Sequence, residues 1–355
     1  MTHSSQPYKA QENDEEALHD RPVKFLVIRF SSIGDIVLTT TALRCLKQQV
    51  KNVEVHFLTK PGFVPVIRAN PYIDRIHVFT SLTKTIKILR QENFNYIVDL
   101  HHNLRSAIIK SALPGISFSF DKLNLEKWLM VNSGINRMPD VHIVDRYLDT
   151  LKLFDVNNDH LGLDYFIPSE DEIDVAGLPP LFHEGYIVFV IGGNHATKRL
   201  PPEKIISITR KIRLPVILAG GREDADLAGI IADACGNDMV LNTCGLYNIN
   251  QSASLVRGAE VVISHDTGLM HIAAAFKKKI ISLWGNTVPA FGMYPYLSHP
   301  DSAAFEVKGL KCRPCSKLGY SRCPRKHFKC MVEQDSGKIA ELARRLFAVK
   351  KEYKA

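Results

Sequence analysis

The sequence predicts an α/β protein made of two Rossmann-like, doubly wound halves that face a common cleft. From Lys24 onward, short β-branched or aliphatic runs alternate with helical patterns, and this alternation breaks once and then restarts. About five strands per half satisfy a helix-covered parallel sheet, which favours two sheets over one large sheet. The length of 355 residues agrees with two domains of roughly 150 residues each.

The first half is expected to contain five strands separated by helices, of which three are clear in the pattern. The strands are Phe25–Arg29, Val53–Leu58, Arg75–Phe79, Tyr96–Leu100 and Ile116–Ser119. The helices are Ile36–Lys47, Leu82–Glu92 and Leu104–Ala112. A stretch containing Pro, Asp and Glu, Ile167–Glu184, then interrupts the pattern and is interpreted as a linker.

The second half repeats the alternation. Its strands are Tyr186–Ile191, Pro215–Ala219, Met239–Asn242, Val261–Ser264 and Lys279–Leu283. Its helices are Pro202–Lys211, Ala225–Cys235, Ile249–Gly258 and Thr267–Phe276. We therefore place the domains at residues 23–170 and 180–335, after a disordered acidic leader over 1–22.

Residues 336–355 form a basic amphipathic helix. Its apolar residues recur at 3–4 spacing: Ile339, Leu342, Leu346, Val349 and Tyr353. We expect the helix to pack back on the domains, and docking on a membrane surface is the alternative.

Charge and composition limit the function. Residues 1–20 carry five acids and one lysine, a net charge of −4. Because the whole chain has a formal charge of +8, the remaining residues carry +12. A basic body favours anionic partners, which include nucleic acid, lipid headgroups and phosphorylated small molecules. No run approaches the ~18 apolar residues of a membrane span, and the polar start does not resemble a signal peptide, so we expect a cytoplasmic protein.

The first strand ends in the turn Arg29–Asp35, which leads into a helix. Ser32 and Gly34 permit a tight turn, and Asp35 falls at the helix start, where the helix dipole stabilises a carboxylate. The position alone fits a helix cap or a catalytic base.

The second half offers further polar loops at strand ends. Gly192–Arg199 combines glycines with a hydroxyl and two cations that can oppose phosphate, but it matches neither the dinucleotide nor the P-loop motif. Glu223 follows a glycine turn, where a carboxylate could hold a ribose. Asp224 and Asp226 spell D-x-D, which we interpret as acids of a first helical turn rather than a metal site.

The segment Ser264–His271 is the most informative. It joins a strand end to a helix start, so the amides of Thr267, Gly268 and Leu269 could bind an anion such as a diphosphate. A D-T-G triplet also occurs in aspartic proteases, but those need two facing carboxylates in an all-β setting, and this chain has one.

The ordered motifs together resemble the ADP-heptose:lipopolysaccharide heptosyltransferase family, glycosyltransferase family 9, over roughly Lys24 to Met331. The resemblance rests on Val27–Asp35, Val98–Leu100 with Arg105-Ser106, Thr197–Pro201, Gly220-Gly221 with Glu223, Asp266–His271 and Trp284–Thr287. It implies a GT-B fold in which the first half binds the acceptor and the second the sugar nucleotide.

The resemblance also implies residue roles. Asp35 is the general base, Lys198 is the second catalytic residue, and Lys198 and the run Asp266–His271 hold the diphosphate. Glu223 contacts the ribose and Tyr247 falls near the adenine. The full set of expected substrate-binding residues is Arg29, Ser32, Gly34, Arg105, Thr197, Glu223, Tyr247, Asp266, Thr267, Gly268, Leu269, His271 and Thr287.

The implied reaction is an inverting transfer of a heptose or related sugar from an ADP-heptose-like donor to an anionic glycolipid acceptor of the lipopolysaccharide inner core. Lys198 and the helix amides could stabilise the leaving diphosphate, so no metal cofactor is required. The acceptor implies peripheral contact with the inner membrane face, and no nucleic-acid partner is expected.

Four cysteines near the end of the second half have spacing compatible with a tetrahedral zinc site: Cys312, Cys315, Cys323 and Cys330. Structural zinc, reduced packed thiols and a disulfide all remain open. Eight Lys or Arg residues and no acid lie between Val307 and Met331, so a zinc-ribbon nucleic-acid-binding protein is one rival to the transferase. A nucleotide-sugar epimerase on the same architecture is the other.

Overall fold

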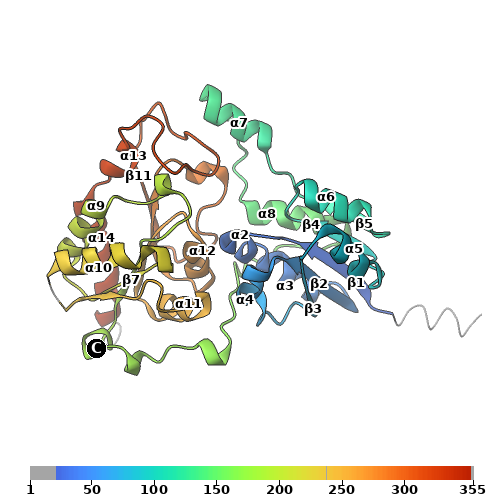
Figure 1. The fold of residues 1–355 in the computed structure, drawn as a ribbon, viewed down its shortest axis with the longest axis horizontal. Helices are drawn as coiled ribbons and strands as arrows, with labels where there is room; N and C mark the ends of the chain where they lie inside the picture. The colour runs from blue at the N-terminus through green and yellow to red at the C-terminus, as the bar shows by residue number, and fades with distance from the viewer. Residues whose placement is uncertain (1–20, 237, 353–355) are drawn as a thin grey trace, which may run out of the picture.

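In the computed structural model, which describes residues 21–236 and 238–352, the chain forms two α/β halves, each built on its own parallel sheet (Figure 1). The predicted fold class is confirmed. The predicted disordered leader covers residues 1–22, of which 1–20 lie outside the described residues. The domain boundaries given above remain predictions.

The first half contains a five-stranded sheet in the order β3-β2-β1-β4-β5. Its strands are β1 (Val23–Ile28), β2 (Val53–Thr59), β3 (Arg75–Val78), β4 (Tyr96–Asp99) and β5 (Ile116–Ser119), as the sequence predicts to within two residues. Its helices are α2 (Ile33–Val37), α3 (Thr40–Gln49), α4 (Val64–Ile67), α5 (Leu82–Arg90), α6 (Leu104–Ser111), α7 (Asn124–Ser133) and α8 (Ile143–Leu148). The short 3-10 helices are η1 (Pro61–Phe63) and η2 (Asp149–Phe154).

The prediction of a single helix over Ile36–Lys47 is wrong. The structure has two helices, α2 and α3, because the hydroxyls of Thr39 and Thr40 donate to the carbonyls of Ile36 and Val37, at 2.7 Å each. Such side-chain bonds to the preceding turn compete with regular helical pairing and bend or interrupt a helix. The interruption leaves α2 as a short separate element at the end of β1.

The second half contains a six-stranded sheet in the order β11-β10-β9-β6-β7-β8. Its strands are β6 (Ile187–Val190), β7 (Val216–Ala219), β8 (Val240–Asn242), β9 (Val261–His265), β10 (Lys279–Trp284) and β11 (Ala303–Glu306). Its helices are α9 (Pro202–Ile212), α10 (Ala225–Cys235), α11 (Ile249–Gly258), α12 (Gly268–Ala275), α13 (Lys329–Val332) and α14 (Ser336–Glu352), with η6 (Ala196–Lys198), η7 (Arg222–Asp224) and η8 (Pro289–Phe291). The sequence does not predict β11, because this four-residue edge strand carries no clear alternation.

Helix α14 packs against its own domain, as expected. Ile339, Ala343 and Leu346 are buried in the core of the second half, beside the apolar face of α9. The side chain of Val349 and all of Tyr353, which extend the predicted stripe, lie outside the described residues. Within the described chain, no helix combines the length and the apolar character that a membrane crossing needs.

The linker is tied to both halves. It contains η3 (Ser169–Asp171), η4 (Val175–Gly177) and η5 (Pro180–Phe182). Asp171 accepts bonds from Arg68 of the first half at 2.7 Å and from Asn248 and Asn250 of the second half at 2.7 and 2.9 Å. One hydrophobic cluster also runs through both halves, so their sheets share a continuous core.

Candidate active site

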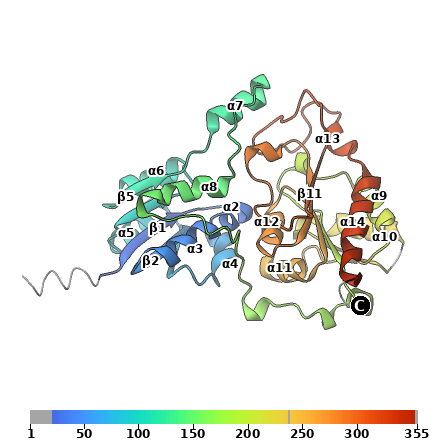
Figure 2. The ribbon, with the colours of Figure 1, turned by 180° about the vertical axis from the view of Figure 1, so that it is seen from behind.

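Helices α2 and α12 meet where the two halves face each other (Figures 1 and 2). A Cβ on Gly268 would lie 2.7 Å from Cγ2 of Ile33, and a Cβ on Gly34 would lie 2.6 Å from Cδ2 of His271. At both positions a larger residue would meet the facing helix, so the two glycines allow α2 and α12 to lie this close. This contact places the turn that carries Asp35 against the amino-terminal end of α12.

Asp35 lies at the third position of α2, and Ser32 is the helix cap. The amide of Ser32 donates to Asp35 Oδ2 at 3.1 Å and its hydroxyl donates to the same oxygen at 2.7 Å. Burial raises the pKa of this carboxyl, but Arg29 and the bonds from Ser32 outweigh it and lower the pKa to about 2. Asp35 is therefore ionised at neutral pH, with its side chain 19% exposed.

Arg29 contacts Asp35 and is itself fixed by hydrogen bonds to other residues of the first half. Its Nη2 lies 2.7 Å from Asp35 Oδ1, its Nε donates to the carbonyl of Ser31 at 2.8 Å, and its Nη1 donates to the hydroxyl of Tyr147 at 3.0 Å and to the carbonyl of Leu100. The guanidinium is buried and occupied, so the geometry fits a residue that positions Asp35 better than one that binds substrate. No local pattern predicts the contact with Tyr147, which is 118 residues away in the chain.

In the second half, Lys198 and Asp266 form an ion pair, with Lys198 Nζ 2.6 Å from Asp266 Oδ2. The hydroxyl of Thr287 donates to the same oxygen at 3.1 Å. A lysine ammonium has three N–H donors, so this pair leaves donors for a ligand. Asp266 would repel a diphosphate, so its role is better described as orienting Lys198 than as contacting the anion.

The first turn of α12 supplies neutral donors beside this pair. Thr267 is the helix cap and shares a hydrogen bond with Ser264 at 3.2 Å, and the amides after it have no acceptor within the helix. His271 is buried, its Nδ1 has no hydrogen-bond partner among the described residues, and burial lowers its pKa. This end of the helix therefore combines positive dipole with a neutral imidazole.

The expected nucleoside contacts lie on adjacent loops. Glu223 follows β7 and Tyr247 follows β8, and the two loops touch: a Cβ on Gly245 would lie 2.7 Å from Cα of Arg222. The amide of Gly245 also donates to the carbonyl of Gly220 at 3.2 Å. Glu223 is exposed and Tyr247 is partly buried, so both side chains remain accessible to a ligand.

Two other expected site residues have different surroundings. Thr197 is buried, and its hydroxyl accepts from the amide of Tyr320 at 2.8 Å, so it anchors the cysteine-rich loop. Arg105 is exposed on α6, and no hydrogen bond or ion pair within the described residues joins it to Asp35.

The two aspartates of the D-x-D pair have different surroundings. Asp224 is 1% exposed, pairs with Arg199 at 2.7 Å and accepts from the amide of Gly221 at 3.0 Å. Asp226 is exposed in the first turn of α10. The two carboxylates are thus divided between a buried ion pair and solvent.

The four clustered cysteines are free thiols, so the disulfide alternative does not occur in the structure. Burial, followed by Cys312 and Cys323, raises the pKa of Cys315, and burial followed by Cys315 raises that of Cys330 to about 11. The sulfur of Cys312 lies 3.7 Å from Nε2 of His327. Within the described chain no three of these ligand atoms approach within 4.8 Å of one another, so a metal would have to draw them together.

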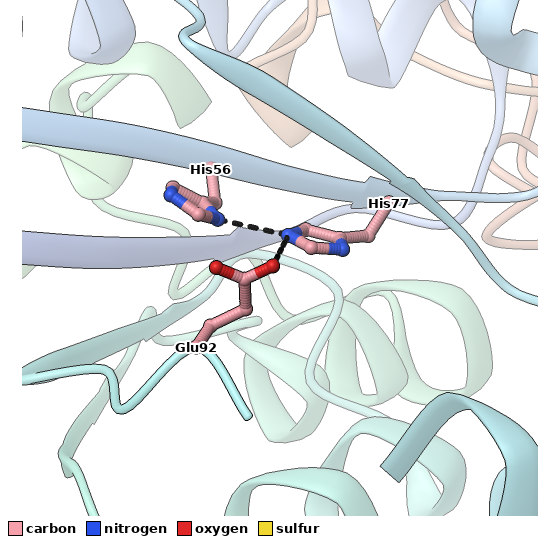
Figure 3. A group of neighbouring side chains, drawn as sticks. All are labelled: His56, His77 and Glu92. Carbon is pink, nitrogen blue, oxygen red and sulfur yellow. Dashed lines mark hydrogen bonds and ion pairs between the residues drawn. The ribbon is translucent and has the colours of Figure 1, made fainter. Parts of the chain in front are cut away.

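A second group of metal-ligand side chains lies on β2, β3 and the loop after α5 (Figure 3). His56 Nδ1 lies 2.8 Å from His77 Nε2, which lies 4.0 Å from Glu92. Burial, followed by the neighbouring His56, lowers the pKa of His77 to about 4, and Lys24 and Arg75 already neutralise Glu92. These contacts make a satisfied polar network within the first half.

Comparison with known proteins identifies the class. The profile of glycosyltransferase family 9 (heptosyltransferase) matches residues 82–318. Lipopolysaccharide heptosyltransferase 1 of Campylobacter coli is 22% identical over 295 residues, which cover 75% of this chain and 84% of that protein. Lipopolysaccharide heptosyltransferase 3 of Escherichia coli K12 is 23% identical over 283 residues, with 73% and 81% coverage.

Solved structures agree on the fold. The ADP-heptose lipopolysaccharide heptosyltransferase II of E. coli superposes with a TM-score of 0.72 at 18% identity, covering 92% of this chain and 99% of that one. A family 9 glycosyltransferase from Veillonella parvula gives the same TM-score and identity. The two sheets, with α2 and α12 meeting between them, form the GT-B fold that these structures share. The family profile matches more than half of this chain, and the chain therefore belongs to glycosyltransferase family 9, the heptosyltransferases.

Proposed function

We propose that this enzyme transfers a heptose from ADP-heptose to an anionic glycolipid of the lipopolysaccharide inner core, with inversion at the anomeric carbon. The observation that carries the proposal is the direct contact of α2 with α12, because it brings an ionised carboxylate close to a helix end suited to a diphosphate. The named relatives support the donor and the acceptor: they are lipopolysaccharide heptosyltransferases, and one solved neighbour is an E. coli heptosyltransferase with ADP.

In this mechanism Asp35 accepts the proton of the acceptor hydroxyl as its oxygen bonds to the anomeric carbon. The bond from that carbon to the diphosphate breaks on the opposite face, and ADP leaves with the electron pair. A carboxyl with a pKa of about 2 is a weak base, so proton transfer is expected to be late, after the attacking oxygen has become acidic. Lys198 and the first amides of α12 oppose the charge that grows on the diphosphate.

The metal assignments are also part of the proposal. The sugar transfer proceeds without a metal ion, because Lys198 and the end of α12 supply the charge that a divalent ion would otherwise provide. The cysteines at 312, 315, 323 and 330 either hold one structural zinc ion or remain reduced thiols, and elemental analysis distinguishes the two states. Dialysis against a chelator should leave the turnover unchanged in either state, and it should lower the melting temperature only where zinc is bound. Loss of turnover at unchanged stability would contradict the structural assignment.

The decisive experiment combines binding and transfer. Thermal shift should select ADP-heptose over UDP-, GDP- and CMP-sugars, because selective binding stabilises the folded state by mass action. Incubation with the glycolipid acceptor should release ADP and give a product of inverted anomeric configuration by NMR. Conversion of the nucleotide sugar without acceptor would instead favour an epimerase.

A further inference from the structure

Helix α7 turns apolar side chains toward solvent. None of its ten residues, all of which the structure describes, is buried, and Leu125 and Trp128 are 65% and 52% exposed. The two residues are three apart and lie on one face of the helix. Short helices owe most of their stability to the packing of an apolar face, so this face fits a partner outside the chain.

The basic loop, which we define as residues Val307–Met331, lies beside α7 although it belongs to the other half of the chain. Lys317 Nζ donates to Asn124 Oδ1 at 3.4 Å, and both ribbon views show α7 reaching toward this loop (Figures 1 and 2). Leu318 is 68% exposed and Tyr320 is 42% exposed. We call the surface formed by α7 and the basic loop the α7–loop surface.

Cations dominate this surface. The basic loop has eight Lys or Arg residues and no acid, and of the eight, Arg313 is used internally by Glu306. The exposed cations of the loop are Lys308, Lys311, Lys317, Arg322, Arg325, Lys326 and Lys329. Surfaces that bind the interface of an anionic bilayer combine exposed Leu, Trp and Tyr side chains with Lys and Arg.

The α7–loop surface adjoins the active site from both sides. The backbone of Tyr320 pairs with Thr197, the residue before Lys198, at 3.2 Å. In the first half, the carboxylate of Asp35 interacts electrostatically with Lys127 on α7, whose pKa is nonetheless lowered to about 8, chiefly by burial and by Arg146. A membrane that covered this surface would therefore lie next to the cleft.

We propose that the α7–loop surface docks on an anionic membrane and so presents the cleft to a lipid-borne acceptor. The purpose of the docking rests on the proposed function, whereas the docking itself does not. Helix α14, the other basic amphipathic element, is excluded from this role because Ile339, Ala343 and Leu346 are buried in the core. Among the described residues, none buries Leu125 or Trp128, which are 65% and 52% exposed.

The first test is cosedimentation of the full chain with vesicles of phosphatidylcholine alone or with about a third phosphatidylglycerol. We expect binding to the anionic vesicles only, and weaker binding in about 0.5 M salt. The double variant Leu125→Gln/Trp128→Gln should bind roughly tenfold more weakly or worse, because it removes the inserted apolar groups. Ile230→Gln is the matched control, since Ile230 is 60% exposed on α10.

Charge is tested in the same way. Lys317→Glu/Arg322→Glu should lower vesicle affinity by roughly tenfold or more, whereas Lys211→Glu on α9 should leave it unchanged. Equal binding by all variants, or no binding by the parent, would overturn the proposal. Binding of single-stranded RNA that is lost in the α7 variants, without vesicle binding, would overturn it in favour of a nucleic-acid surface.

Tryptophan emission gives an independent readout. The chain has two tryptophans, and Trp284 is 1% exposed, so a vesicle-induced blue shift reports on Trp128. Trp128→Phe should still bind vesicles and lose most of the shift. Transfer to a water-soluble, deacylated acceptor should survive in Leu125→Gln/Trp128→Gln while transfer to the vesicle-embedded acceptor falls. Failure of transfer in the parent with intact vesicle binding would contradict the proposed function and leave the docking surface standing.

Discussion

Arg29 and Asp35 form an ion pair across the turn that joins β1 to α2, with Nη2 of the arginine 2.7 Å from Oδ1 of the aspartate. The pair is nearly buried, and two other donors from Ser32 fix the second carboxylate oxygen. The arrangement holds the carboxylate ionised and in one orientation, which a base needs and an ordinary helix start does not require.

Asp35→Asn tests the role of Asp35 as a base. Asparagine keeps one acceptor oxygen but cannot take a proton, so turnover should fall by ~10²-fold or more while ADP-heptose affinity stays close to the parent value. Because the change leaves Arg29 without its counter-charge, melting should also fall, and turnover is therefore measured on the folded fraction at low temperature. Ser32→Ala, which keeps the carboxylate, should cost less than about tenfold. Parental turnover in Asp35→Asn would leave Asp35 only a structural role.

Arg29→Gln tests the cause of the low pKa. Without the guanidinium, the bonds from Ser32 remain the main opposition to burial, so the pKa of Asp35 should rise. In a plot of kcat/KM against pH, the fall in activity on the acid side, the acid limb, should then move from below the measurable range to a higher pH. The depressed pKa of Asp35 stabilises the parent fold above the unfolded-state value of about 3.9, and this contribution is lost as the pH falls toward 2; the variant should lack it.

Tyr147→Phe is the matched control for this change. It removes one acceptor of Arg29 but leaves the ion pair with Asp35 in place, so the acid limb should not move. An acid limb that shifts equally in both variants would point to a general loss of structure at the turn.

Lys198 and Asp266 should separate in their kinetic effects. Lys198→Ala removes a charged contact worth ~1.5–3 kcal/mol, so ADP affinity and turnover should both fall by roughly 10- to 100-fold. Asp266→Asn removes the negative charge beside the diphosphate, so ADP affinity should hold or rise. Its turnover should fall, because Lys198 loses the partner that orients it at 2.6 Å. ADP titration and steady-state kinetics measure the two effects, and equal losses of ADP affinity in both variants would contradict these roles.

The sequence predicts the parts of this site that depend on local pattern. Buried strands and the turns after them place Asp35, Lys198 and Asp266 at the carboxyl ends of strands, since such ends meet at one edge of a parallel sheet. The pairs themselves are not predictable in this way. Lys198 and Asp266 are 68 residues apart, and no local periodicity records which distant partner a side chain finds.

Local sequence patterns also mispredict a helix where two patterns compete. The apolar spacing over Ile36–Lys47 predicts one helix, but the hydroxyls of Thr39 and Thr40 break it. Helix α7 is not predicted because it lacks the usual signal. None of its residues is buried, so its sequence shows no apolar stripe of the kind that packs on a core.

The contact of Gly268 with the turn of α2 leads to the last prediction. In Gly268→Ala, the new Cβ would lie 2.7 Å from Cγ2 and 2.8 Å from Cβ of Ile33, so α2 must move away from α12. Overpacking of this kind costs about 1–3 kcal/mol, and here the displaced element carries Asp35. ADP binding, which we assign to the second half, should change little, while turnover falls because the base moves away from the anomeric carbon.

The control for this variant is Gly229→Ala. Gly229 lies inside α10, and a Cβ there meets nothing within 4 Å, so the change should raise the free energy of unfolding by up to about 1 kcal/mol and leave turnover unchanged. Thermal melting, ADP titration and steady-state kinetics on the two variants separate the effects. If Gly268→Ala keeps both parental stability and parental turnover, then α2 and α12 are not in contact in the working enzyme, and the distance between base and diphosphate must be set elsewhere. If instead ADP affinity falls with turnover, the alanine disturbs the end of α12 itself, and the two helices act as one binding element.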